Sequence, residues 1–204
     1  MAPTHSLPDQ PQPLGDDQRR CLLELARKSI RHGLEYGCPL GILVPDYPDA
    51  LRRIAASFVT LHWGGQLRGC IGHLEAFEPL VEDVVGNAWS AAFRDPRFRP
   101  VTAAEFPGLH IHISVLSPPH PVHFLNEADL LRQIRPGLDG LILADGRHRG
   151  TFLPSVWEAL PSVDDFWRHL KVKAGLPPDY WSGSLTVQRY HTESFEEPLP
   201  RPAR

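Results

Sequence analysis

The sequence predicts an α+β protein with a mainly antiparallel sheet and flanking helices. Three observations support this. Apolar residues recur at helical spacing in several long segments, short alternating segments meet at tight turns, and strands and helices do not follow one another in a regular βαβ order. Strands that come in hairpins and are separated by helices are typical of the α+β class.

The first half of the chain predicts two helices and one hairpin. Apolar residues at helical spacing predict helices over 17–34 and 79–93. Between them, strands are expected over 58–62 and 66–72, joined by a two-glycine turn at 64–65. Glycine pairs favour the turn types that connect two adjacent antiparallel strands.

The second half predicts further strands around two shorter helices. Apolar residues alternate over 109–116, which places His110 and His112 on the face opposite the apolar one. Exposed or partly paired histidines are the simpler interpretation, because a metal site needs further ligands that the sequence does not identify. The other expected elements are helices over 126–133 and 163–174, a hairpin over 139–144 and 147–153, and a strand over 185–192.

Composition restricts the function classes. The 204 residues fit one domain or two small lobes, and a net charge of -3 makes nucleic-acid binding the weakest hypothesis. No apolar run approaches the roughly 20 residues of a membrane helix. An odd number of scattered cysteines, three in all, argues against a disulfide framework and favours the cytoplasm. Proline-rich tails at 1–15 and 198–204 are expected to be disordered and to flank one domain over 16–197.

Common catalytic and cofactor motifs are absent from the sequence. It contains no GxGxxG after a strand, no GxxxxGK[ST], no GxSxG and no HExxH. No cofactor and no metal site is therefore predicted.

One segment, Leu-Arg-Gly-Cys-Ile-Gly over 67–72, carries the main chemical candidate. Gly69 and Gly72 lie within a predicted strand, where glycine marks a bulge or a close approach to the backbone. Strand alternation puts Arg68 and Cys70 on one face, and a guanidinium beside a thiol favours the nucleophilic thiolate.

The opposite interpretation of Cys70 is a packing residue. If the turn at 64–65 sets the register, Val59 and Leu61 share the face of Cys70, and the thiol points into the core. Both interpretations stay open at this point. A dyad between Cys70 and His73 requires a bulge at Gly72, because the two side chains otherwise lie on opposite faces.

Positive charge gathers near several loop and strand ends. Such clusters are ordinarily solvated surface, but they form an anion pocket if the fold brings them together. The residues concerned are Arg94, Arg97, Arg99, Arg147, Arg149, Arg168, His169, Lys171 and Lys173.

Five blocks taken together resemble the AMMECR domain family, also called AmmeMemoRadiSam system protein A. They are the hexapeptide 67–72, Ala-Ala-Phe-Arg-Asp-Pro-Arg-Phe over 91–98, Ser-Val-Leu-Ser-Pro-Pro over 114–119, Arg-Gly-Thr-Phe-Leu-Pro with Val-Trp over 149–157, and His-Leu-Lys-Val-Lys-Ala-Gly-Leu over 169–176. The blocks occur in order and the resemblance covers roughly 17–197. His73 departs from the commonest family pattern, which often has Ser there.

The resemblance implies a larger α+β lobe and a smaller lobe separated by a cleft, in a cytoplasmic protein of unsettled activity. Bacterial and archaeal relatives often accompany a Memo-like protein and a radical S-adenosylmethionine (SAM) protein. This association implies a shared modification pathway or complex, with these two proteins as candidate partners.

Two functions remain in competition. In the first, Cys70 is the nucleophile, Arg68 favours its thiolate and His169 accepts the proton. A small anionic ligand would then be bound by the candidate residues Gly69, Gly72, Arg94, Arg149, Thr151, Lys171 and Lys173. In the second, the domain is a non-catalytic adaptor that docks onto another protein.

Overall fold

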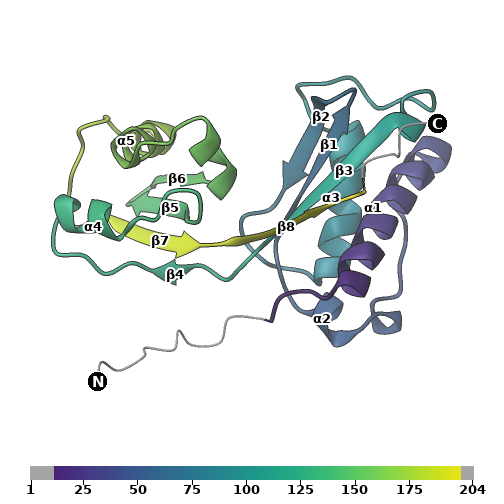
Figure 1. Ribbon diagram of the computed structural model, residues 1–204, viewed down its shortest axis with the longest axis horizontal. Coiled ribbons are helices and arrows are strands. Elements are labelled where there is room, and N and C mark those ends of the chain that lie inside the picture. Colours follow the sequence, from purple (N-terminus) through teal and green to yellow (C-terminus); the bar gives the residue numbers. More distant parts are fainter. Residues whose placement is uncertain (1–11, 199–204) are drawn as a thin grey trace. The chain divides into compact units, whose positions relative to one another are not determined.

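The computed structural model describes residues 12–198 and divides the chain into two compact units (Figure 1). Unit 1 is formed by the chain up to Leu116 together with the chain from Glu193 onward, and unit 2 is Ser117–Thr192. Both combine an antiparallel sheet with helices, which confirms the α+β class. Each unit is described by itself. None of the helices within 12–198 is long and apolar enough to cross a membrane.

The expected tails fall mainly outside the described residues. This applies to 1–11 and 199–204, whereas the end of the first tail belongs to unit 1. Leu14 is only 2% exposed and packs in the core. Its amide donates hydrogen bonds to the Glu193 carboxylate at 3.0 and 3.1 Å, so the ordered unit begins before residue 16.

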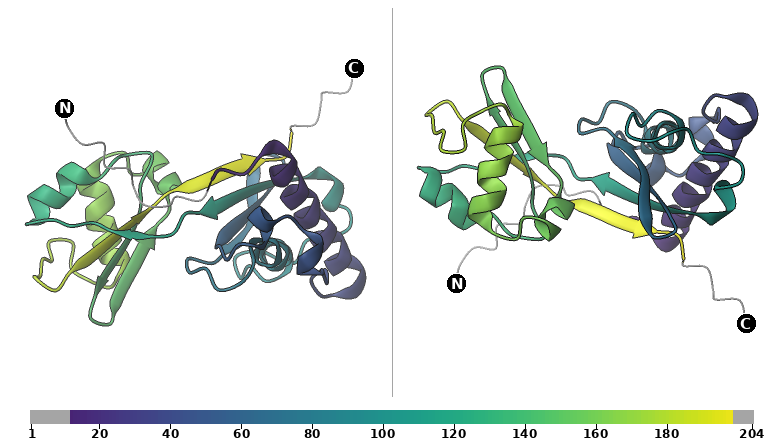
Figure 2. Two further views of the ribbon diagram at one scale, coloured as in Figure 1. Left: turned by 90° about the horizontal axis from the view of Figure 1, so that it is seen from below. Right: turned by 90° about the horizontal axis from the view of Figure 1, so that it is seen from above.

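Unit 1 is a four-stranded sheet with helices on one face. The strand order is β2-β1-β3-β8, with β1 Ser57–Trp63, β2 Gln66–Gly72, β3 Leu109–Leu116 and β8 Thr192–Glu196. Helices α1, Asp16–Tyr36, and α3, Leu80–Phe93, pack on each other and on the apolar face (Figure 2). Short helical segments Val44–Asp46, Asp49–Arg52 (α2) and Phe106–Gly108 complete the unit.

The apolar face of this sheet is fully buried. Val59, Leu61, Ile111 and Ile113 are each 0% exposed, and they alternate with polar residues on the other face. We call that other face the open face. It carries Thr60 and His62 of β1 with His110, His112 and Ser114 of β3, so the predicted placement of the two β3 histidines is correct.

A bulge in the β1–β2 hairpin changes the expected register. From the turn, Trp63 pairs with Gln66 and His62 with Leu67, but Leu61 then pairs with Gly69 and Thr60 with Cys70. Arg68 is the extra residue, and one extra residue moves every later side chain of the strand to the other face. The register that places Cys70 beside Val59 and Leu61 is therefore wrong, and Cys70 lies on the open face.

Unit 2 is built on a second four-stranded sheet. Its order is β4-β7-β5-β6, with β4 His120–Pro121, β5 Gly140–Asp145, β6 His148–Phe152 and β7 Thr186–Tyr190. Helices α4, Glu127–Gln133, and α5, Val163–Lys173, accompany it together with the short helix Pro154–Glu158. The core centres on Phe166, whose ring stacks on Trp157 at 3.8 Å between centroids.

The two sheets differ from the single sheet that the sequence predicts. The strand expected over 185–192 divides near His191, so that β7 joins unit 2 and β8 joins unit 1. Strand β8, Thr-Glu-Ser-Phe-Glu, has Phe195 as its one apolar residue, so it lacks the regular apolar alternation that would have marked it as a strand.

Candidate functional site

The two glycines of the segment 67–72 permit close packing inside unit 1. A side chain at Gly69 would overlap the backbone carbonyl of Ala91, because α3 lies directly against β2 there. A side chain at Gly72 would overlap the ring of Phe58, its partner across the hairpin. Both glycines, predicted as ligand-binding residues, thus lie where a helix and an aromatic ring approach the strand.

Cys70 is half-buried and lies on the open face. The hydroxyl of Thr60, its partner on β1, donates a hydrogen bond to the sulfur at 3.3 Å. The sequence did not indicate Thr60, because the pairing of these two residues depends on the bulge at Arg68.

The backbone of Cys70 is held by an ion pair from the loop after α3. Its N–H donates to Asp95 Oδ2 at 2.8 Å, and its carbonyl accepts from Arg97 Nη2 at 3.3 Å. Asp95 and Arg97 also bind each other at 2.7 Å. Together they occupy the outer edge of β2, where a neighbouring strand would otherwise pair.

Asp95 is almost completely buried, with 4% exposure. The Arg97 guanidinium, followed by the Cys70 N–H, holds the pKa of this carboxyl well below its usual range. The hydrogen bond to Asp95 in turn raises the pKa of Arg97, and the negative charge of a Cys70 thiolate contributes less. Asp95 and Arg97 belong to the block Arg-Asp-Pro-Arg over 94–97, which the sequence had singled out. The sequence did not show that these two residues contact Cys70.

Arg68, expected to activate Cys70, is directed elsewhere. Its guanidinium binds Glu105 at 2.8 Å and donates to the Arg99 carbonyl at 2.9 Å. This pairing holds the pKa of Glu105 at about 2. Within residues 12–198 Arg68 makes no hydrogen bond to the Cys70 sulfur, and Arg97 is the cation whose contacts reach Cys70.

Two other predicted residues of unit 1 lie in separate surroundings. The Arg94 guanidinium stacks over the Trp89 ring at 5.1 Å. His73 Nδ1 lies 2.6 Å from Asp83 Oδ1, so its imidazole is paired with α3 and does not form a dyad with Cys70.

In unit 2, His169 borders a cavity of about 250 Å³ with Asp165, Arg168, Val172 and Pro178. His169 Nδ1 lies 2.8 Å from the Asp165 carbonyl. A carbonyl only accepts hydrogen bonds, so Nδ1 carries the hydrogen, and in the neutral ring Nε2 carries the free lone pair. This geometry suits a proton acceptor.

The other predicted residues of unit 2 differ in exposure: Lys171 is buried and Thr151 half-buried, whereas Arg149 and Lys173 are exposed. Lys171, predicted as an anion ligand, is 2% exposed and binds the Glu127 carboxylate at 2.8 Å. Lys173 lies over the Phe152 ring at 5.0 Å, and the Thr151 hydroxyl donates to the Leu141 carbonyl at 2.9 Å. Arg149 lies on β6 opposite Ala144.

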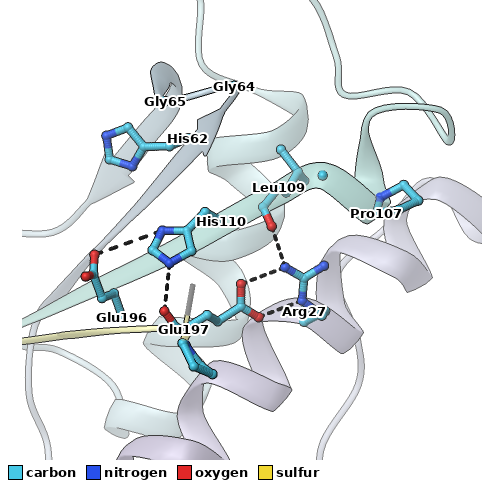
Figure 3. Close-up of a pocket in the computed structure, with 11 residues that line it drawn as sticks. Arg27, His62, Gly64, Gly65, Pro107, Leu109, His110, Glu196 and Glu197 are labelled. Atoms are coloured by element: carbon cyan, nitrogen blue, oxygen red, sulfur yellow. Dashed lines mark hydrogen bonds and ion pairs between the residues drawn. The ribbon is translucent and has the colours of Figure 1, made fainter. Parts of the chain in front are cut away.

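A larger cavity of about 640 Å³ lies in unit 1 at the end of the open face (Figure 3). Its lining includes Gly64, Gly65, Pro107 and Gly108. The cationic group there, Arg27, is paired with Glu197 at 2.6 Å and with the Leu109 carbonyl at 2.7 Å (Figure 3). These contacts attach the end of the described chain to α1 and β3.

Three histidines, His62, His110 and His112, lie together on the open face. The sequence did not indicate that His62 lies near the other two. His62 and His110 are paired across β1 and β3, and His112 pairs with Thr60. Burial lowers the pKa of His112, and the charge of Glu196 opposes this effect. The neutral form of the His112 imidazole is therefore favoured. His112 lies on β3, directly opposite Thr60 on β1.

Comparisons with known proteins agree on one family. The AMMECR1 family model matches residues 23–195. A protein of Methanothermobacter thermautotrophicus is 39% identical over 91% of this chain and 97% of its own length. Protein MJ0810 of Methanocaldococcus jannaschii is 38% identical over 78% and 82%, respectively.

A solved structure extends this agreement to the fold. The crystal structure of the uncharacterized protein PH0010 from Pyrococcus horikoshii is similar, with a TM-score of 0.81 and 36% identity, covering 93% of this chain and 96% of that chain. The blocks that resembled the AMMECR domain lie within the matched region. The chain belongs to the AMMECR1 family.

Proposed function

We propose that this protein is a cytoplasmic component of a modification pathway in which Cys70 acts as a thiolate nucleophile on a small anionic substrate. The sulfur would bond to an electrophilic carbon, the leaving group would depart with the bonding electron pair, and the thiol proton would pass to a neighbouring base. A Memo-like protein and a radical SAM protein are the proposed partners in that pathway.

The observation that carries this proposal is the placement of the Cys70 sulfur. The residue is half-buried on the open face, and its sulfur accepts a hydrogen bond from the Thr60 hydroxyl at 3.3 Å. The bulge at Arg68 produces this orientation. Asp95 binds the N–H of Cys70 and Arg97 binds its carbonyl, so the pair holds the backbone of this residue in place. A packing thiol would need neither an outward register nor an external donor.

Within unit 1 the proposed substrate contacts are Arg97 and the polar groups of the open face. Arg97 retains 55% exposure of its side chain although it binds Asp95, so part of its guanidinium faces solvent. In unit 2, His169 and Arg168 border a cavity and remain candidates for anion binding there. The deeply buried Lys171 is the weakest of the predicted anion ligands.

Alkylation rates test the nucleophile directly. The native protein is treated with iodoacetamide at pH 7, and each cysteine peptide is followed by mass spectrometry. Cys70 is expected to react faster in the native protein than in urea, because folding supplies the Thr60 donor. Equal or slower reaction of native Cys70 would overturn the nucleophile.

The other two cysteines are matched controls in the same sample. Cys38 is exposed, and burial raises the pKa of the Cys21 thiol, so Cys21 is expected to react more slowly when folded. Only Cys70 should be accelerated by folding. If Cys38 is accelerated equally, a general effect of the medium accounts for the result.

The adaptor function has one observation in its favour. Trp63 and Leu67, at the tip of the β1–β2 hairpin, are 48% and 42% exposed. Exposed apolar side chains at the tip of a hairpin are accessible to a partner protein, and a contiguous apolar patch is typical of a docking surface. If Trp63→Ser abolishes capture of a Memo-like protein while Cys70→Ser retains it, docking through the hairpin is the better description.

A further inference from the structure

A second group of chemically active side chains lies just beyond the end of β2. It consists of His73, Glu78 and Asp83, whose ligand atoms all lie within 4.8 Å of one another. His73 follows β2, Glu78 lies in the loop, and Asp83 is in the first turn of α3. The contacts of these residues differ from those of the Cys70 site.

Asp83 is the fixed member of this group. It is 1% exposed, and its Oδ2 accepts hydrogen bonds from the Ser57 N–H at 2.7 Å, the Ser57 hydroxyl at 2.5 Å and the Asn87 amide at 2.9 Å. These donors saturate one oxygen and orient the other toward His73. Hydrogen bonds that hold a carboxylate in this way are the usual support of a metal ligand.

His73 completes the geometry on the solvent side. Its Nδ1 lies 2.6 Å from Asp83 Oδ1, and its side chain is 40% exposed. The Phe77 ring packs edge-on against the imidazole with centroids 4.6 Å apart. The imidazole is thus oriented on two sides while ions can still approach it from water.

The group brings two carboxyl groups and one imidazole together. The ligand atoms of Glu78 and Asp83 lie within 4.8 Å of each other and of the His73 ring nitrogen. Two carboxylates held this close repel each other, and a cation placed between them removes that repulsion.

From this geometry we propose that His73, Glu78 and Asp83 bind one divalent transition-metal ion of the Zn²⁺, Mn²⁺ or Fe²⁺ type. Ligand atoms about 2.0–2.2 Å from an ion lie about 3.0–3.5 Å from one another, so only small side-chain movements are needed. One imidazole nitrogen with two carboxylates suits these ions better than Mg²⁺ or Ca²⁺, which prefer oxygen alone. Three protein ligands leave positions for water or substrate.

Calorimetric titration of chelator-treated protein with Zn²⁺ tests the site. The full chain is expected to bind one Zn²⁺ equivalent, with an affinity at least about tenfold lower in His73→Gln and in Glu78→Gln. Both substitutions change partly exposed side chains and spare Asp83, which also holds Ser57 and Asn87. The thermal midpoint should rise with Zn²⁺ in the unaltered protein and rise less in either variant.

His32→Gln is the matched control. His32 lies 3.9 Å from the Cys38 sulfur, so these two side chains offer Zn²⁺ an adventitious site elsewhere in unit 1. The affinity should be unchanged in this variant. Unchanged affinity in both His73→Gln and Glu78→Gln, or its loss in His32→Gln, would overturn the site and leave the group as a hydrogen-bonded His–Asp pair.

Discussion

The buried carboxylate of Asp95 accepts the N–H of Cys70 at 2.8 Å, so the loop after α3 holds the strand that carries the candidate nucleophile. Asp95→Ala should remove this bond and leave both the Cys70 amide and the Arg97 guanidinium without their partner. We expect a loss of about 2–4 kcal/mol in unfolding free energy, measured by urea denaturation. Asp46→Ala, at an exposed carboxylate, should change it by less than about 0.5 kcal/mol.

The Arg68–Glu105 pair predicts a stability change in acid. Its hydrogen bonds hold the pKa of Glu105 at about 2, below the value of about 4.3 in an unfolded chain. A lowered pKa in the folded state contributes stability above pH 4.3 and loses it as pH falls toward 2. Glu105→Gln should therefore be less stable than the unaltered protein at pH 7. Its urea midpoint should also change less between pH 5 and pH 2. A parallel pH profile in the variant would contradict this prediction.

Gly69 permits the close contact between β2 and α3. We therefore expect a methyl group added at this position to lower the stability of the protein strongly. Gly69→Ala places that methyl group against the Ala91 carbonyl, and we expect a loss of about 2–3 kcal/mol or more. Gly86→Ala is the control, because Gly86 lies in α3 with open space around its Cα. It should stabilise the helix by about 0.5–1 kcal/mol. Thermal unfolding measures both effects. The midpoint temperature should fall in Gly69→Ala and rise in Gly86→Ala.

Lys171 is expected to support unit 2 and not to bind an anion. Lys171→Met keeps the apolar stem but removes the ammonium group that Glu127 binds at 2.8 Å. Because Glu127 is partly exposed, we expect a moderate loss of about 1–3 kcal/mol in urea denaturation. Lys173→Met should cost less than about 1 kcal/mol. A Lys171→Met variant as stable as the unaltered protein would show that the pair contributes nothing.

Thr60 is expected to act on the reactivity of Cys70 and not on stability. Thr60→Val preserves the shape of the side chain and removes the hydroxyl that donates to the sulfur. Loss of one hydrogen bond of about 1 kcal/mol predicts roughly fivefold slower alkylation of Cys70. The rate at Cys38 in the same sample serves as the control. An unchanged Cys70 rate would show that the hydroxyl does not assist the sulfur.

Much of the fold could be predicted because the elements of unit 1 have strong periodic patterns. The strands found at Gln66–Gly72 and Leu109–Leu116 have the expected bounds, and α1 and α3 differ from prediction by one or two residues. The polar strand β8 could not be predicted, because its place is determined by pairing beside β3 and not by an apolar pattern of its own.

The candidate site was predictable in its residues but not in its contacts. Cys70 was identified from its neighbours in the sequence, whereas its orientation depends on the bulge at Arg68, which a two-residue turn does not reveal. The assignment of Arg68 as the activating cation assumed regular alternation. A bulge breaks that alternation, so Arg97 and not Arg68 makes the cationic contact with Cys70.

Unit 1 needs both ends of the described chain, and this has a consequence for folding during synthesis. Strand β8 leaves the ribosome after all of unit 2, so the outer edge of β3 has no partner until then. Glu193 accepts a hydrogen bond from the Leu14 amide and pairs with Arg19 at the start of α1, and it is synthesised equally late. The nascent chain should therefore complete unit 2 first, and any chaperone that shields an unpaired strand would act during this interval.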